Sequence, residues 1–353
     1  MRVKIRKRVI ESRKKIILLK LLAVILALLA DAIIFLVMNV DPVKAYYEIF
    51  EAAFFTEYGL TETIVKFIPL ALISYGLALV FKAQIWNIGA EGQLLLGAIV
   101  STWVALNLGY LPPYVIIPLM YLSGFLAGLC WALIPAILKA RLQVNEVLTT
   151  FMLNLVAQKI LEYFVYGPWR DPHGWGFPQT AMFSENARLP LIPGTRIHYT
   201  TLLIVVLSGI VLYVLSLKTT LGYEVRVLGG NINAAKYAGI NITKIIILTM
   251  IISGGLAGIA GVGEVGGIQF RLRPNISPGY GYTGIVIAWL GGLNPLGITL
   301  AAFLYSGLLV GGDALQVAIK LPQATINVFN GSILFFILAF EFFTSYEIIF
   351  ERR

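Results

Sequence analysis

Polar side chains recur at every fourth position along one apolar stretch of the chain, at Glu146, Thr150, Asn154, Gln158 and Glu162. On an α-helix this spacing places them in one slowly turning stripe. If the helix lies in a membrane, each charge facing lipid near the centre costs on the order of 2–3 kcal/mol, so the stripe is expected to face protein or water. Two interpretations stay open: the stripe hydrogen-bonds a neighbouring helix, or it lines a hydrated pathway.

A second polar group opens the apolar segment that follows it, at 86–93. Asn87 and Glu91 share one helical face, and Gly89 and Gln93 share another. A helix cap would account for Asn87 and Glu91, because asparagine caps helix starts and glutamate favours their positive end. It would not account for Gln93 or the paired glycines, so a second role is expected here.

Segment 261–269 repeats this combination of glycine, glutamate and glutamine in the second half of the chain. The similarity suggests an inverted internal repeat, a device with which membrane transporters build alternating access. Polar placement in apolar helices marks the candidates for lining a substrate pathway, which are Asn87, Glu91, Gln93, Asn145, Glu146, Asn154, Glu264 and Gln269.

Other chemistries find little support in the residue types. Cys130 is the single cysteine, so no intrachain disulfide is possible, and His173 and His198 lie in one polar loop without the cluster that zinc requires. The apolar segments hold no Ser/His/Asp set for catalysis. The chain also lacks the Gly-x-x-x-x-Gly-Lys-Ser/Thr loop that cradles phosphates. We therefore expect no enzyme, no metal, no cofactor and no ATP hydrolysis by this chain.

Composition places the chain in a membrane. Of its 353 residues 58% are hydrophobic and only 13% charged, too few for the surface of a soluble globule. Nine Lys or Arg residues stand in the first twenty positions against the single Glu11, directly before the apolar run 16–38. This run is long enough to span the bilayer, and its basic flank predicts an uncleaved anchor with the N-terminus in the cytoplasm. The rest of the chain is nearly neutral, so no nucleic-acid partner is expected.

Further apolar windows predict an all-α, polytopic membrane protein with eight to ten transmembrane helices, some of them broken. The windows lie at 64–81, 88–106, 114–138, 148–166, 200–217, 245–262 and 326–343. Between 263 and 312 short apolar pieces alternate with glycine and proline, which is tolerated at membrane depth only beside protein or a cavity. The pairs Gly124 with Gly128 and Gly254 with Gly258 predict close helix packing.

The predicted organisation has a transmembrane domain at 16–345 between a basic cytoplasmic N-terminus, 1–15, and a cytoplasmic tail, 346–353. Within the domain, 167–199 is expected outside the cytoplasm and 218–244 inside, because the latter carries four Lys or Arg residues against one Glu.

Several motifs together resemble the permease subunit of bacterial and archaeal ABC importers, in the branch that serves simple sugars, nucleosides and branched-chain amino acids. They lie within 64–312 and read NIGAEGQ at 87–93, NEV at 145–147, GYEVR at 222–226, AAKYAGI at 234–240, GYGY at 279–282 and GGLNP at 291–295. With the outer loop rich in Trp and Pro, the resemblance is greatest to the nucleoside or sugar type. It implies the translocation pathway of an ATP-driven importer in the inner or plasma membrane.

The resemblance also implies partners. These are cytoplasmic ATP-binding subunits, a second permease subunit that is homologous or identical, an extracytoplasmic substrate-binding protein and the lipid bilayer. A short helix fits between Gly230 and Gly239, with Asn231 or Asn233 as N-cap, and is expected to couple to the ATPase. The candidate coupling residues are Glu224, Arg226, Asn231, Ala234, Ala235, Tyr237 and Gly239. The alternative interpretation is an ordinary cytoplasmic connector.

Trp169 and Trp175 are the candidate receptor-docking residues of the outer loop. Aromatic side chains among prolines suit a firm docking face, although they also suit an interfacial belt at the lipid headgroups. Two alternatives to the favoured function remain: a permease for branched-chain amino acids, and a secondary transporter that works without an ATPase.

Overall fold

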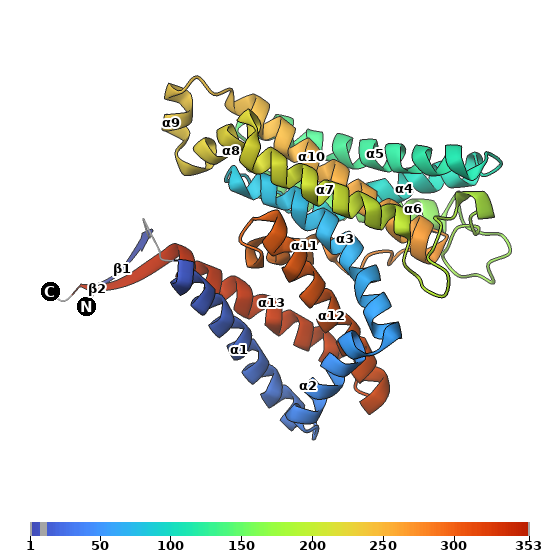
Figure 1. Cartoon of the computed structure of the whole chain (residues 1–353). Helices are drawn as coiled ribbons and strands as arrows, with labels where there is room; N and C mark the ends of the chain where they lie inside the picture. Colours follow the sequence, from blue (N-terminus) through green and yellow to red (C-terminus); the bar gives the residue numbers. More distant parts are fainter. Residues whose placement is uncertain (1, 8–12, 352–353) are drawn as a thin grey trace. The chain divides into compact units, whose positions relative to one another are not determined.

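Helices make up nearly all of the regular structure in the computed structural model, which describes residues 2–7 and 13–351 (Figure 1). They are α1 (Arg13–Val37), α2 (Pro42–Phe50), η1 (Glu51–Phe55), α3 (Glu57–Lys82), α4 (Ala90–Asn107), α5 (Pro113–Leu142), α6 (Glu146–Tyr166), η2 (Glu185–Ala187), α7 (Tyr199–Lys218), α8 (Thr220–Gly230), α9 (Ile232–Tyr237), α10 (Ile242–Gly263), η3 (Glu264–Gln269), α11 (Tyr280–Leu290), α12 (Pro295–Ile319) and α13 (Gln323–Ser345). The predicted all-α class is confirmed.

Two short strands at the chain ends were not expected from the sequence. β1 (Arg2–Lys7) pairs antiparallel with β2 (Tyr346–Glu351), so that Arg2 lies opposite Glu351. The predicted terminal segments 1–15 and 346–353 lie partly outside the described residues.

Five helical segments in the described part of the chain are long and apolar enough to cross a membrane: α3, α5, α7, α10 with η3, and α12. A sixth candidate is the pair formed by α1 and α2, which is bent by 117° at the break. The predicted eight to ten spans also count α4 and α6, whose polar side chains lower their hydropathy. That count stays a prediction, whereas the polytopic character is confirmed.

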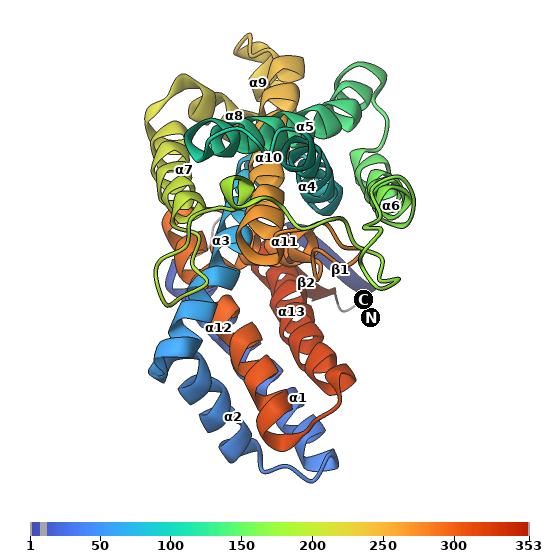
Figure 2. The ribbon, with the colours of Figure 1, turned by 90° about the vertical axis from the view of Figure 1, so that its right-hand side faces the viewer.

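Residues Ile64–Phe303 form one compact unit around α10. α10 packs along α4 and α5 and also contacts α7 and α8, and Figure 2 shows it in the middle of these helices. α8 and α9 lie at one end of this unit and the loop 167–198 at the other (Figure 1). α7 and α10 connect the two ends, so the segments predicted to lie inside and outside the cytoplasm are at opposite ends of the unit. Which end faces the cytoplasm stays a prediction.

Glycines set the spacing between α10 and its neighbours. A Cβ atom on Gly258 would lie 2.1 Å from the carbonyl oxygen of Gly124, and one on Gly254 would lie 2.5 Å from that of Gly128. The predicted packing of these two pairs is thereby confirmed. α4 approaches equally closely, because a Cβ on Gly97 would lie 2.4 Å from the Gly258 carbonyl oxygen.

The region from 263 to 312, expected to be broken, begins with a helical segment that changes character. α10 continues as the π-helix η3, which ends where Phe270 adopts a left-handed conformation with φ 53°. An irregular loop leads to α11, which has 11 residues, and a turn with Leu293 at φ 55° leads to α12. At ~1.5 Å per residue, α11 is too short to cross a bilayer.

The second compact unit comprises Met1–Thr63 and Leu304–Arg353. α1 packs along α13, where the Phe35 and Phe329 rings lie 5.8 Å apart, and Phe35 also meets the Tyr46 ring edge-on at 5.6 Å. The buried carboxylate of Asp31 accepts a hydrogen bond from the Ser332 hydroxyl. Sequence patterns had not predicted α2 and η1, which reverse the chain after α1.

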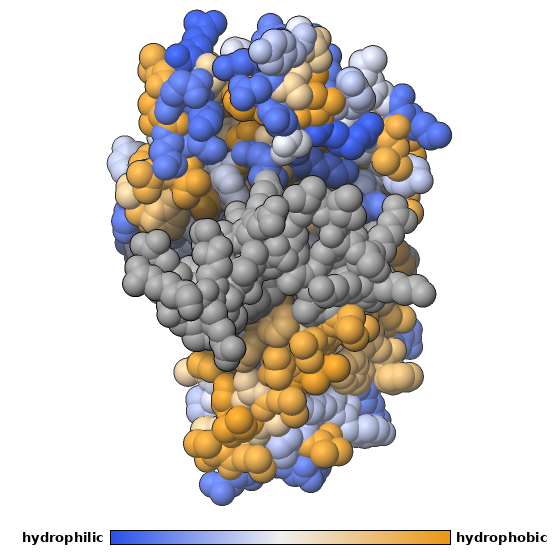
Figure 3. All heavy atoms as spheres, turned by 90° about the vertical axis from the view of Figure 1, so that its left-hand side faces the viewer, coloured by the Kyte–Doolittle hydropathy of each residue, from blue (hydrophilic) through white to orange (hydrophobic). Residues whose placement is uncertain are grey.

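An exposed apolar stripe runs along α1 in this unit. Its members recur every three or four residues, with two adjacent pairs among them, and are Leu18, Leu21, Leu22, Ile25, Leu29, Ile33, Leu36 and Val37. In Figure 3 the described surface of α1 is coloured orange, which marks hydrophobic residues. Such a stripe is what a lipid-facing helix requires.

Candidate functional site

The start of α4 is organised by a pair of buried amides. The Nδ2 atom of Asn87 donates to the Oε1 atom of Gln93, and the Nε2 atom of Gln93 donates back to Asn87 Oδ1, both at 3.1 Å. Asn87 Nδ2 also donates to the hydroxyl of Ser253 on α10, and Asn87 Oδ1 accepts from the Gly89 amide. Asn87 therefore shapes the turn before α4, while the N-cap position itself belongs to Gly89.

Glu91 joins α4 to a segment far away in the chain. Its Oε2 atom accepts the backbone amide of Gly281 at 2.7 Å, in the first turn of α11. A Cβ on Gly281 would lie 2.2 Å from the Glu91 nitrogen, so only glycine permits this approach. The carboxylate thus accepts an otherwise unpaired N–H at a helix start, where its charge is also favourable.

Asn154 joins α6 to the start of α4 and to the first turn of α11. Its Oδ1 atom accepts the Gly92 amide at 2.8 Å, and its Nδ2 atom donates to the Ile88 carbonyl at 2.8 Å and to the Tyr282 hydroxyl at 3.2 Å. We call Asn87, Glu91, Gln93, Asn154 and Ser253 the polar cluster. It ties α4, α6, α10 and α11 together inside one unit.

The other polar residues of the stripe predicted along this helix, which we call the α6 stripe, make contacts at different positions along α6. Thr150 accepts the Ile88 amide at 3.2 Å, and Gln158 donates to the Pro274 carbonyl at 3.2 Å. Glu146 pairs with Lys139 at 2.9 Å, and Glu162 pairs with Lys159 at 2.7 Å. These contacts favour the interpretation as interhelical hydrogen bonding for Thr150, Asn154 and Gln158. Lining of a pathway stays a prediction.

Asn145 is set apart from the polar cluster. Its Oδ1 atom accepts the amides of Val147 and Leu148, which makes it the N-cap of α6, and its side chain is exposed. The structure therefore gives this predicted pathway residue a local role in starting the helix.

The remaining predicted pathway residues, Glu264 and Gln269, lie at the two ends of η3. Glu264 is 5% exposed, and its charged neighbours are Lys66, Glu91 and Arg196. Gln269 donates to the Ile276 carbonyl at 3.4 Å, while its Oε1 atom is buried and has no partner among the described residues. π-helical turns often occur at functional sites, so η3 is a natural place for such groups.

Comparison with known proteins identifies the family of the chain. Residues 59–338 match the family described as "Branched-chain amino acid transport system / permease component". The chain belongs to this permease family. It is a transport component of an ABC system rather than an enzyme, and the resemblance inferred from the motifs is confirmed.

Three relatives extend over nearly the whole permease. It is 39% identical to the glucose ABC transporter permease protein TsgB13 of Haloferax volcanii, over 94% of this chain and 90% of the relative. It is 32% identical to the guanosine ABC transporter permease protein NupP of Bacillus subtilis, over 91% and 92%. It is 31% identical to the nucleoside ABC transporter permease protein NupB of Lactococcus lactis subsp. cremoris, over 92% of each.

The segment predicted to couple to an ATPase folds into two helices, of which only the second was expected. α9 has six residues; Asn231 caps it by accepting the amides of Asn233 and Ala234, and Gly239 ends it at φ 71°. Both predicted boundary signals are confirmed. Tyr237 is 95% exposed, whereas Ala235 is buried, so α9 presents most of its surface to the surroundings of the permease.

α8 supports α9 from the preceding residues. Arg226 donates to the Ser216 carbonyl at the end of α7, and a Cβ on Gly229 would lie 1.9 Å from the Lys82 carbonyl oxygen at the end of α3. Arg226 thus has a structural contact within the permease, while Glu224 is half-buried on the same helix. Figure 3 shows that hydrophilic residues gather at this end.

The two tryptophans predicted to dock a receptor differ in their surroundings. Trp169 stacks on Phe164 of α6 with ring centroids 4.1 Å apart, so it packs within the permease. Trp175 is 95% exposed, and Phe177 beside it is 66% exposed. Of the pair, only Trp175 offers a free aromatic surface.

His198 is a buried residue whose role sequence reasoning missed. It directly precedes α7 and is fully buried against η3, where a Cβ on Gly267 would lie 2.5 Å from the imidazole Cδ2 atom. Neither imidazole nitrogen has a hydrogen-bond partner among the described residues. Burial lowers the pKa of His198 to about 4, so the ring is neutral at physiological pH.

Sequence reasoning also missed Ser253 of the polar cluster and Tyr282, which hydrogen-bonds to the cluster. Ser253 and Tyr282 contact Asn87 and Asn154, respectively. A hydroxyl inside the very apolar α10 was a usable signal for Ser253. Tyr282 belongs to the GYGY motif at 279–282, but the spacing of that motif did not predict a contact with α6.

Proposed function

We propose that this permease forms the pathway of an ATP-driven importer for a sugar or a nucleoside. The observation that carries the proposal is the extent of the similarity to permeases named for glucose, guanosine and nucleosides, which covers at least 90% of each chain. Glu91, Asn154, Glu264 and Gln269 are proposed to border the pathway, because they are polar groups held within a hydrophobic helical unit.

A second candidate substrate class is the branched-chain amino acids, which the family description names. An assay in proteoliposomes that contain the full complex separates the two. Uptake of glucose or guanosine that depends on ATP supports the proposal, whereas ATP-dependent uptake of leucine alone supports the second candidate. Uptake driven by an ion gradient without ATP would contradict both.

The proposed transport cycle requires ATP-binding subunits that bind at α9, a related second permease subunit, and a receptor that docks at the opposite end of the unit, on the loop 167–198. α9 supports this assignment because a small exposed helix with one buried alanine is suited to insertion into a groove. Trp175 is the proposed receptor contact. Both chain termini are proposed to be cytoplasmic, and the antiparallel pairing of β1 with β2 supports their location on one side of the membrane.

Tyr237→Ala tests the coupling assignment, because this side chain is exposed and its removal leaves the fold intact. Substrate-stimulated ATPase activity of the reconstituted complex is expected to fall strongly. Tyr110→Ala is the matched control: Tyr110 is 76% exposed and lies near the loop end, where the neighbouring Gly109 carbonyl accepts a hydrogen bond from Ser184. Equal stimulation in both variants would refute the role of α9.

A further inference from the structure

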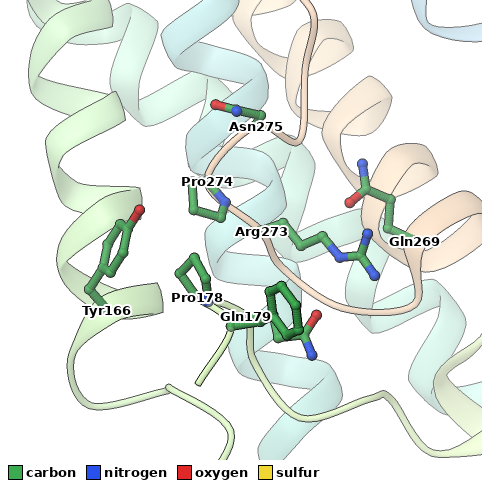
Figure 4. Close-up of a pocket in the computed structure, with 8 residues that line it drawn as sticks. Tyr166, Pro178, Gln179, Gln269, Arg273, Pro274 and Asn275 are labelled. Carbon is green, nitrogen blue, oxygen red and sulfur yellow. The ribbon is translucent and has the colours of Figure 1, made fainter. Parts of the chain in front are cut away.

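A groove opens at the loop end of the compact unit, and we call it the loop groove. The residues that define it are Tyr166, Phe177, Gln179, Gln269, Arg273 and Asn275. Its volume is about 600 Å³, within the ~300–1,000 Å³ typical of small-molecule sites. In Figure 4, Tyr166 projects from α6 on one side and Gln269 lies on the other, with Pro178 and Arg273 between them.

Backbone hydrogen bonds hold the walls of the loop groove in place. Thr180 exchanges two hydrogen bonds with Leu272, one from its backbone amide at 3.1 Å and one to its hydroxyl at 3.0 Å. Phe183 donates to the Phe270 carbonyl at 2.8 Å, so the segments after α6 and after η3 run together over several residues. Because the walls are fixed before any ligand arrives, little ordering entropy opposes binding.

The lining offers both donors and acceptors of hydrogen bonds that the fold does not use. The buried Oε1 atom of Gln269 lacks a partner among the described residues, which is unusual because buried polar atoms in proteins are nearly always paired. The Arg273 side chain is exposed, and no contact within the described chain engages its guanidinium. The exposed guanidinium of Arg273 can therefore donate to hydroxyl, carbonyl or ring-nitrogen acceptors of a ligand.

The charges and rings of the loop groove restrict the ligand class. No acidic side chain is among the described residues that line it, so a cation or the ammonium group of an amino acid finds no oppositely charged partner there. The rings of Tyr166 and Phe177 supply flat apolar walls, against which a sugar ring or a nucleobase packs. Planar amides and a guanidinium beside such rings suit a neutral ligand rich in hydroxyl or ring nitrogen groups.

The position of the loop groove connects it with the residues proposed to border the pathway. Gln269 is the last residue of η3, and Glu264 is the first. Gln158 of the α6 stripe donates a hydrogen bond to the carbonyl of Pro274, which lines the groove. We propose that the loop groove is a first binding site for a neutral polyhydroxylated or nucleobase-containing solute, before the solute passes deeper into the permease. This inference rests on the proposed function and extends it to a site and a ligand class.

Protection of an introduced thiol tests the proposal in the full complex with Cys130→Ser as background, because Cys130 is exposed. Asn275→Cys places a thiol in the loop groove, and Gln179→Cys does so from the other wall. Met182→Cys, at a residue 50% exposed outside the groove lining, is the control. Labelling by a membrane-impermeant maleimide is measured while glucose, guanosine or leucine is titrated, and transport of each is measured in the same preparation.

The solute that the complex transports is expected to slow labelling of the groove thiols and not that of Met182→Cys. A site occupied to nine-tenths slows the reaction about tenfold. Transport of glucose or guanosine with unprotected groove thiols would overturn the inference and leave the proposed function standing. Equal slowing at the control would also overturn it. A complex that transports neither solute would remove the proposed function and the inference together.

Discussion

The glycine contact between α10 and α5 gives the most direct test of the packing. In Gly258→Ala the new Cβ would lie 2.1 Å from the Gly124 carbonyl oxygen, where ordinary contact begins at 3.4 Å. The obstacle is backbone, so no side-chain rotation relieves it, and the helices must separate locally by about 1.3 Å. Gly97 of α4 faces the same residue, so the shift disturbs two interfaces.

A separation of this size forfeits roughly half of the dispersion energy of the contacts involved, and overpacked cores lose about 1–3 kcal/mol. We expect the melting temperature of the detergent-solubilised complex, measured by fluorescence-detected size-exclusion chromatography, to fall by several degrees.

Gly331→Ala is the matched control, because Gly331 lies inside α13 and no atom of the described residues lies within 4 Å of its added Cβ. Alanine favours helix over glycine, so this variant should melt at or slightly above the temperature of the original chain. Identical melting of Gly258→Ala and Gly331→Ala would refute the inference that glycine contacts set the helix spacing.

Three further outcomes are expected. Asn154→Leu leaves the Gly92 amide and the Ile88 carbonyl without partners, at a cost of about 1–3 kcal/mol for each buried group, and a melting temperature equal to that of the original chain would contradict this. Asn231→Ala removes the cap of α9, worth about 1 kcal/mol, so hydrogen exchange should accelerate locally in 232–239. His198 keeps a folded pKa of about 4, against 6.5 when unfolded, so its stabilisation is complete above pH 6.5 and lost as the pH falls towards 4. His198→Leu should therefore show a smaller loss of melting temperature between pH 7 and pH 5.

Local signals were sufficient to predict the helices and several of their contacts. The apolar windows lie on α1, α3–α7, α10 and α13, because an apolar run of about 20 residues has few alternatives in a membrane. The ends of α9 could be predicted from Asn231 and Gly239, because a capping side chain and a glycine with positive φ affect only the few residues next to them. Glycine pairs spaced by four predicted close packing, although not the α4 partner.

Contacts between distant segments were beyond these signals. Glu91 and Gly281 are 190 positions apart, and neither residue type predicts a contact with the other. The same applies to the loop groove, whose walls come from the segments after α6 and after η3. The reversal at α2 was missed for another reason: Pro42–Phe55 carries Lys44, Glu48 and Glu51, so it fell outside the apolar windows that predicted the helices, and the 117° bend was not marked.

The contacts within the unit Ile64–Phe303 limit how a displacement of α9 can travel through it. Glycine contacts lock α4, α5 and α10 together, and the polar cluster locks α6 and α11 to α4. Sliding any one of these helices would break buried hydrogen bonds or open close-packed backbone, each costing on the order of 1–3 kcal/mol. α8 meets the ends of α3 and α7 through Gly229 and Arg226, and it also contacts α10. A displacement of α9 is therefore expected to move α4, α5, α6, α10 and α11 together, as one body.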